Sequence, residues 1–100
     1  MAKKRKIVWS NNAKTSKYKV FRFYIDRNQN NTYVKKLNSL FNQKIKLLKS
    51  FPNIGIKTDL PNIRGLIINN FIIFYEITET QIIIHKIWDS QQDDKKLSIK

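Results

Sequence analysis

The stretch over residues 69–89, NNFIIFYEITETQIIIHKIWD, constrains the fold more than any other part of the sequence. It reads as a hairpin of two strands that are apolar at almost every position. A strand with one face in water alternates apolar and polar residues. Here Phe71 and Ile73 fall on one face, but Ile72 and Phe74 fall on the other. The apolar side chains on both faces of the hairpin therefore have to be buried. In a chain of 100 residues, they are buried either by other parts of the chain or by a partner.

A chain of this length is expected to form a single domain with two layers of secondary structure. Its hydrophobic fraction of 41% predicts a folded core rather than disorder. The absence of cysteine excludes a disulfide framework and a thiolate zinc site, and a single histidine does not suggest a metal site. We therefore expect no metal and no cofactor. Because no stretch reads as a signal peptide or a membrane span, we expect a cytoplasmic protein.

The formal charge of +13 lies almost entirely in the first half of the chain. Residues 1–50 carry 14 lysines and arginines and one acid, Asp26, whereas residues 51–100 carry six residues of each sign. The positive side chains in this half of the chain repel one another unless an anionic partner is near. In electrostatic terms, this partner is nucleic acid, an acidic protein or a membrane surface. The plain alternative is that these lysines form the solvated faces of helices.

Two helices are predicted in the first half of the chain. Ser10 is a favourable N-cap for a helix over residues 11–26, and Asn31 or Thr32 caps a second helix. The second helix shows the clearest periodic pattern in the chain. Its apolar stripe consists of Val34, Leu37, Phe41, Ile45 and Leu48. Pro52 ends this helix, because proline disfavours a helical conformation of the residue before it.

Four strands are predicted, over residues 6–9, 63–68, 71–77 and 81–88. Asn69 and Asn70 form a tight turn between two of them, since asparagine tolerates a positive φ. Residues 52–62 are assigned to a loop. Residues 1–4 read as a basic tail and residues 89–100 as a polar tail of one domain that spans residues 1–100.

The predicted order is β-α-α-β-β-β, which is an α+β unit. Two adjacent helices with one apolar stripe each can cover one face of a small sheet, but not both faces. Ile72, Phe74 and part of the last strand are left on an open, concave side. We therefore expect a second chain to occupy this side.

The last strand carries polar side chains that are candidates for chemistry. Strict alternation puts His85 on the face of Ile83 and Ile87. It puts Lys86 on the face of the other apolar residues of the strand, which are Ile82, Ile84 and Trp88. His85 is then either a satisfied, partly buried histidine or a catalytic base, and Lys86 is either a snorkelling lysine or a catalytic cation.

Five segments carry a family likeness: KIVWSNNAK at the first strand and helix, the Pro-x-x-Gly loop PNIG, the strand start IRGL, the strand FIIFYEI, and the last strand and tail IIIHKIWDSQQDDKKL. In this order they resemble the RelE/ParE superfamily of bacterial toxins from type II toxin–antitoxin modules. The resemblance implies a helical hairpin packed on one face of a small, mainly antiparallel four-stranded sheet. It also implies a growth-inhibiting toxin that a cognate antitoxin holds inactive in a hetero-oligomer by covering exposed sheet and helix surfaces.

The superfamily combines two activities, which are mRNA cleavage on the ribosome by RelE-like members and poisoning of DNA gyrase by ParE-like members. Metal-free RNA cleavage needs a base for the 2′-hydroxyl and cations for the phosphorane charge. Where ribonuclease members have an arginine this chain has Ile72, and where they have a basic residue in the tail it has Gln91 or Gln92. The resemblance with this departure favours inhibition of gyrase. A ribosome-dependent mRNA endonuclease and an inactive basic binding domain are the alternatives, and none of the three involves a membrane.

Two groups of candidate site residues follow. The weak catalytic candidates are Arg64, His85 and Lys86. The candidates for binding the antitoxin or the target are Ile72, Phe74, Arg64, Lys57 and Trp88. A structural role for Arg64, pinning the loop before the sheet, is an equal alternative. Trp88 either stacks on a base or closes an edge of the core.

Overall fold

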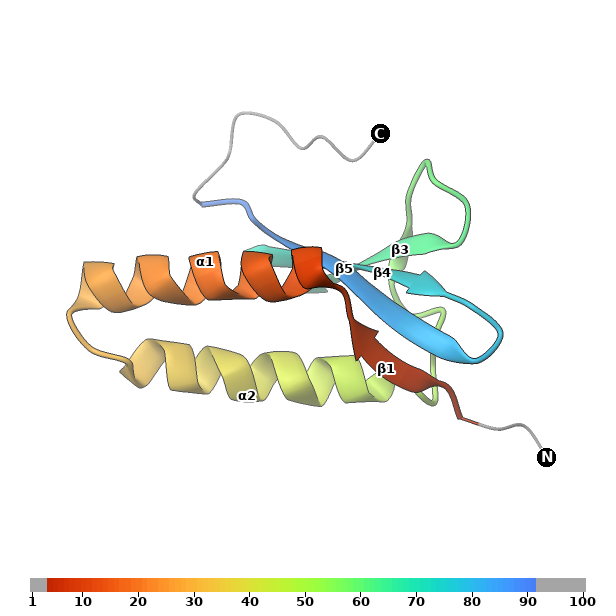
Figure 1. Cartoon of the computed structure of the whole chain (residues 1–100), viewed down its shortest axis with the longest axis horizontal. Coiled ribbons are helices and arrows are strands. Elements are labelled where there is room, and N and C mark those ends of the chain that lie inside the picture. Colours follow the sequence, from red (N-terminus) through yellow and green to blue (C-terminus); the bar gives the residue numbers. More distant parts are fainter. Residues whose placement is uncertain (1–3, 92–100) are drawn as a thin grey trace.

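The structure is a computed structural model, and it describes residues 4–91. It consists of a helical hairpin and a five-stranded sheet (Figure 1). The elements in chain order are β1 (Lys6–Trp9), α1 (Asn11–Asn28), α2 (Thr32–Leu47), β2 (Ile56–Lys57), β3 (Ile63–Ile68), β4 (Phe71–Ile77) and β5 (Gln81–Asp89). The predicted α+β class and the order of the main elements are confirmed.

The strands lie in the order β1-β5-β4-β3-β2. β1 runs parallel to β5, and every other neighbouring pair is antiparallel. The sheet has one strand more than the four predicted, because Ile56 and Lys57 pair with Gly65 and Arg64 of β3. The sequence assigns these two residues to a loop, since prolines and a glycine punctuate the segment and two residues carry no alternation pattern.

α1 begins where the sequence predicts. The Ser10 side-chain oxygen accepts a hydrogen bond from the backbone N–H of Ala13 at 3.0 Å, which satisfies one of the free donors of the first turn. The helix runs two residues further than predicted and ends at Gln29, whose φ of 60° is left-handed and cannot continue a helix.

α2 begins at Thr32 without a side-chain cap from Asn31. Instead, the side-chain oxygen of Asn30 accepts a hydrogen bond from the backbone N–H of Thr32 at 3.0 Å. The predicted apolar stripe of this helix is confirmed, because all five of its residues are buried. These are Val34, Leu37, Phe41, Ile45 and Leu48.

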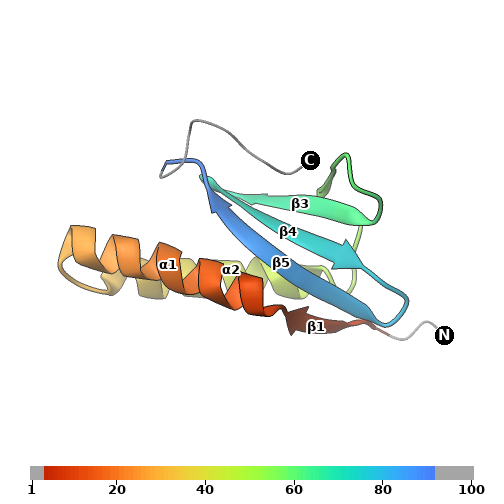
Figure 2. The ribbon, with the colours of Figure 1, turned by 45° about the horizontal axis from the view of Figure 1, so that its top comes forward.

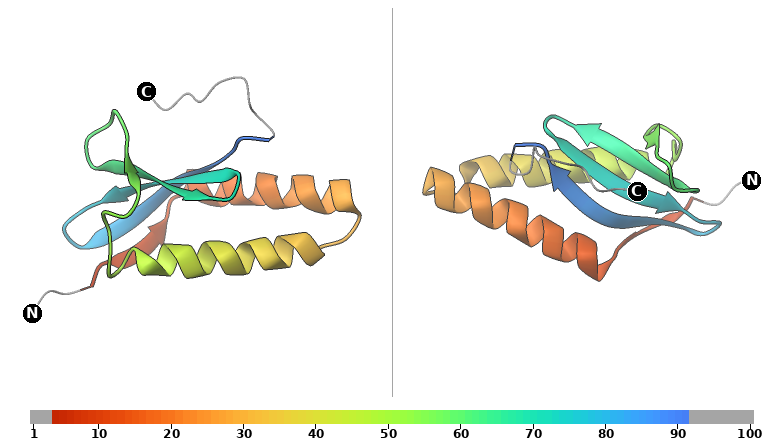
Figure 3. Two further views of the ribbon diagram at one scale, coloured as in Figure 1. Left: turned by 180° about the vertical axis from the view of Figure 1, so that it is seen from behind. Right: turned by 90° about the horizontal axis from the view of Figure 1, so that it is seen from above.

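The core lies between the helices and one face of the sheet. Figure 2 shows both helices on this side of the sheet. The views from behind and from above also show the helical hairpin on one side of the sheet (Figure 3). The buried strand residues on this face are Leu66, Ile68, Phe71, Ile73, Tyr75, Ile82, Ile84 and Ile87. The rings of Phe41 and Phe71 meet edge to face with their centroids 5.3 Å apart, which joins α2 to the sheet.

A β-bulge interrupts the pairing of β4 with β5. Phe74 pairs with Lys86, whereas the next residue, Tyr75, pairs with Ile84. His85 is therefore an extra residue on β5 with no partner position opposite it. A bulge of this kind shifts the alternation of all later residues by one position.

The bulge corrects two predictions about the last strand. Ile87 is buried on the helix side, so the prediction that it shares a face with His85 is wrong. Lys86 pairs with a residue of the other face, so the prediction that it shares a face with Ile82 and Ile84 is also wrong. A period of two cannot reveal a bulge, because all the residues around it are apolar.

The ends of the chain differ from the predicted tails. Asp89 belongs to β5 and is buried, so the polar tail does not begin there. Most of both predicted tails, residues 1–3 and 92–100, lies outside the described residues. Within residues 4–91, no helix has the length and apolar character that a bilayer crossing requires.

Candidate functional site

The face of the sheet turned away from the helices is here called the open face. It is formed by Ile67, Ile72, Phe74, Ile83 and Trp88. Ile67 is 54% exposed and Ile72 is half-buried. Phe74 lies on this face as predicted, but it is only 3% exposed, so the expectation that it is uncovered is wrong.

Phe74 is sheltered by the chain itself. It lines a groove of about 270 Å³ whose other wall is the segment 56–59, and this is called the open-face groove. Gly65 allows the close fit, because a Cβ there would lie 2.9 Å from Cγ2 of Ile72 and 3.4 Å from the Phe74 ring. Two isoleucines remain accessible at the groove, Ile67 and Ile56, the latter 60% exposed. The apolar open face is therefore narrower than the sequence predicts.

Arg64 and Tyr75 hold the loop between α2 and β2. Arg64 donates from Nη1 to the carbonyl oxygens of Asn53 and Gly55, at 3.2 and 2.8 Å. The Tyr75 hydroxyl donates to the Pro52 carbonyl at 2.7 Å and accepts from the Gly55 N–H at 3.0 Å. Burial raises the pKa of Tyr75, which keeps the hydroxyl a donor. These contacts support the structural alternative for Arg64.

Lys57 is exposed and pairs with Arg64 across β2 and β3. Both side chains line a second hollow of about 560 Å³, together with Asp59. The structure thus brings two predicted binding residues together at one edge of the sheet. His85, a catalytic candidate, is not among the residues that line this hollow.

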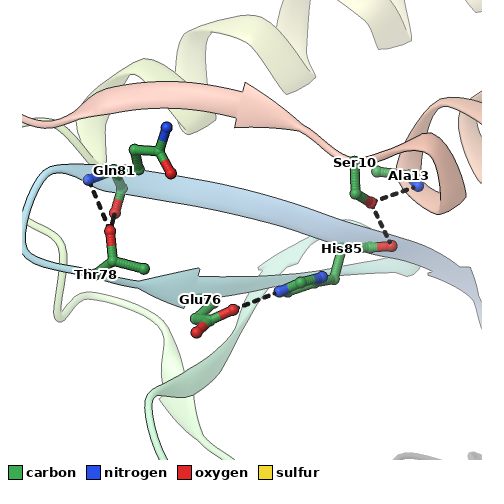
Figure 4. A network of polar contacts seen from close by, with 6 residues as sticks. All are labelled: Ser10, Ala13, Glu76, Thr78, Gln81 and His85. Carbon is green, nitrogen blue, oxygen red and sulfur yellow. Dashed lines mark hydrogen bonds and ion pairs between the residues drawn. The ribbon is translucent and has the colours of Figure 1, made fainter.

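His85 lies on the open side of the bulge. Its Nε2 is 2.8 Å from Oε1 of Glu76 on the neighbouring strand, and both side chains are partly exposed (Figure 4). The backbone carbonyl of His85 also accepts a hydrogen bond from the Ser10 hydroxyl at 3.4 Å (Figure 4). The sequence pattern does not indicate a role for Glu76, although it is the one acid in an otherwise apolar strand.

Lys86 and Trp88 lie on the same side of the sheet. Lys86 pairs with Phe74 and is exposed, and Trp88 pairs with Ile72 and is half-buried. The indole N–H of Trp88 is buried and donates to no acceptor within residues 4–91. A donor of this kind is costly to leave unpaired, which makes this strand position suited to an acceptor from elsewhere.

A second polar contact that the sequence did not indicate joins α1 to the end of β5. The Tyr24 hydroxyl donates to Oδ2 of Asp89 at 2.8 Å and to Oε1 of Gln91 at 3.2 Å. Burial, and then the hydrogen bond to Asp89, raise the pKa of Tyr24. Because the partners are 65 residues apart, no local pattern could have revealed them.

The open face offers limited means for chemistry. His85 with Glu76 is a paired base, and Lys86 is a cation on the same side. Ile72, next to Phe71, is apolar and offers a phosphate no charged hydrogen bond. Among the described residues there is no group of three or more His, Asp or Glu side chains that could hold a metal ion.

Two solved structures with a similar fold come from toxin–antitoxin systems. One is from "Chromosomal ParDE TA system from P. aeruginosa", with a TM-score of 0.73, 16% identity, and coverage of 85% of this chain and 95% of that chain. Another is from the E. coli DinJ-YafQ toxin-antitoxin complex, with a TM-score of 0.53, 12% identity, and coverage of 90% and 97%. A search of curated proteins finds no match.

The sequence itself gives the family. Residues 7–94 match the family model described as ParE toxin of type II toxin-antitoxin system, parDE. This range includes both helices and all the strands of the sheet except Lys6, the first residue of β1. The chain therefore belongs to the ParE toxin family, within the RelE/ParE superfamily.

Proposed function

We propose that this type II toxin inhibits growth by binding DNA gyrase rather than by cutting mRNA, and that a cognate antitoxin neutralises it. The observation that carries the choice of mechanism is the composition of the open face. Ile67, Ile72 and Trp88 give it an apolar character, and Ile72 replaces the arginine of the ribonuclease pattern. An apolar strip suits a protein surface better than a phosphodiester.

The catalytic cost of having isoleucine in place of an arginine at position 72 supports this proposal. A single donor that stabilises a developing oxyanion contributes about 2.7–4 kcal/mol to a transition state. Ile72 supplies none, and Nη1 of Arg64 is occupied by two loop carbonyls. A ribonuclease with these changes would depend on Lys86 and, at the open-face groove, on Lys57 for its cations. Neither lysine offers the bidentate phosphate contact of an arginine.

A supercoiling assay tests the proposal. Purified toxin is added in excess to gyrase, ATP and relaxed plasmid, and the products are separated after treatment with detergent and protease. We expect loss of supercoiling, and linear DNA if the enzyme is trapped in its cleaved state. Unaltered supercoiling at stoichiometric excess would contradict the gyrase assignment.

Toeprinting of a translated message tests the alternative of mRNA cleavage, which the His85–Glu76 pair specifically favours. We expect no new cuts in the ribosomal A site. If cuts appear and the His85→Gln variant abolishes them, the toxin is an endonuclease and the gyrase proposal is wrong. Induced expression that leaves growth unaffected would instead favour the inactive binding domain.

The antitoxin is proposed to cover the open-face groove, because Ile67 and Ile56 are accessible there. Ile67→Glu should weaken capture of the antitoxin at least tenfold, measured by titrating toxin variants against the purified cognate antitoxin. Leu47→Glu is the matched control, because Leu47 is 45% exposed but lies on α2. Equal losses in both variants would show that the groove is not the contact surface.

A further inference from the structure

A separate groove lies between α1 and the outer edge of β1, on the opposite edge of the sheet from β2. It has a volume of about 690 Å³ and is here called the α1–β1 groove. Three lysines and three aromatic residues are among its lining side chains, and no acid is. These are Lys6, Lys14, Lys17, Trp9, Tyr18 and Phe21.

Lys17 is the central cation of this groove. Its Nζ lies 4.8 Å from the centroid of the Trp9 ring and 5.6 Å from that of Phe21. The side chain is half-buried, and burial lowers the pKa of Lys17. Within residues 4–91 no carboxylate forms an ion pair with it, because the ion pairs there join Arg22 to Asp26 and His85 to Glu76. A partly desolvated ammonium is thus held against aromatic rings without an anion.

Helices α1 and α2 do not supply this anion. The first half of the chain has a single acid, Asp26, and its carboxylate is bound to Arg22 one turn earlier on α1. The other lysines of α1 and α2 extend the positive field beyond the groove. The groove and the helices beside it thus offer an extended positive surface to an anion from another molecule.

The aromatic side chains define the anion further. Tyr18 is 66% exposed, and the half-buried Trp9 lines the same groove. Single-stranded nucleic acid is bound by this combination, with lysines that follow the phosphates and flat rings on which bases stack. A polyacidic peptide would match the lysines, but it has no flat rings to lie on Tyr18. A duplex would match the charge, but its bases are already stacked on one another.

We propose that the α1–β1 groove binds single-stranded nucleic acid, with phosphates at Lys6, Lys14 and Lys17 and bases against Trp9 and Tyr18. This site is distinct from the open face and does not depend on the gyrase proposal. It would give the toxin an affinity for exposed single strands, DNA or RNA, through the sugar–phosphate backbone and base stacking that both share.

Fluorescence anisotropy with a labelled oligo(dT) of about 12 nucleotides tests the proposal on the full chain, within the usual range of site sizes. We expect saturable binding. The logarithm of the association constant should fall linearly with the logarithm of the salt concentration. The slope should be roughly −2, because each neutralised phosphate of a single strand contributes about −0.7. An oligo(rU) of equal length distinguishes DNA from RNA as the preferred source.

Two groove variants and one control separate the site from general charge. Lys17→Gln should reduce the salt slope by about 0.7, and Tyr18→Ala should weaken binding about tenfold at constant charge. The control is the double variant Lys35→Gln, Lys36→Gln, which removes twice the charge from α2 but leaves the groove intact. If the control weakens binding as much as Lys17→Gln, the groove is not a site and the proposal is wrong.

A direct readout comes from Trp9 in a Trp88→Phe background, where it is the remaining tryptophan. Unlabelled oligo(dT) should quench its emission, with a midpoint equal to the anisotropy Kd, in a protein whose circular dichroism is unchanged. Absence of quenching, equal binding of a duplex of the same length, or equal competition by poly-glutamate would each overturn the assignment to single-stranded nucleic acid.

Discussion

At the scale of single residues, the tightest constraint is at Gly55, where the loop approaches Tyr75. A Cβ at this position would lie 2.6 Å from the Tyr75 hydroxyl oxygen and 3.0 Å from the Gly65 carbonyl oxygen. Gly55→Ala should therefore lower the free energy of unfolding by about 1–3 kcal/mol, the usual cost of overpacking, in urea unfolding. Gly65→Ala, which meets only side chains, should cost less, and the reverse order would contradict this account.

The pair of Tyr24 and Asp89 makes a prediction about pH. The pKa of Tyr24 is raised above its ordinary value of 10.0 in the folded protein, so the unfolded chain loses this proton first as the pH rises. The free energy of unfolding should then fall above about pH 10, since the folded state binds more protons. Urea unfolding between about pH 8 and pH 11 measures this, and Tyr24→Phe should make the decline shallower. A decline that is just as steep in the variant would exclude Tyr24 as its source.

At the scale of elements, α1 and α2 begin differently. The Ser10 side chain caps α1, whereas Asn31 makes no capping hydrogen bond at α2. Ser10→Ala should therefore cost about 0.5–2 kcal/mol of stability, and Asn31→Ala should be close to neutral. Chemical denaturation of the two variants side by side measures the difference. Equal losses would mean that the geometry of the first turns does not determine the stability of these helices.

The elements also show what the sequence can reveal. The strands and helices with a clear period, such as the α2 stripe ending at Leu48, are predicted almost to the residue. The bulge at His85 and the two-residue β2 are missed, because one is hidden within an apolar run and the other is too short for a pattern. The open face is predicted in outline, but the burial of Phe74 depends on a loop that packs across it.

At the scale of the whole molecule, the two layers have different surface chemistry. Helices α1 and α2 hold nine of the 14 cations in the first half of the chain and its one acid, whereas the open face of the sheet combines apolar residues with Glu76, His85 and Lys86. The nucleic-acid site and the antitoxin surface proposed above consequently lie on different elements. A toxin could in this way hold an anion and a protein at the same time.

The concentration of charge in one layer makes a last prediction, about salt. Like charges on α1 and α2 are closer together in the folded state than in the unfolded chain, so their repulsion destabilises the fold. Raising NaCl from about 10 mM to about 300 mM shortens the Debye length from about 30 Å to below 8 Å and should raise the Tm of the isolated protein. A variant with glutamine at Lys35, Lys36, Lys44 and Lys46 should start from a higher Tm and respond less to salt. If its Tm rises with salt as steeply as that of the natural chain, repulsion within the helical layer is not what limits stability, because the four lysines removed are exposed cations of that layer.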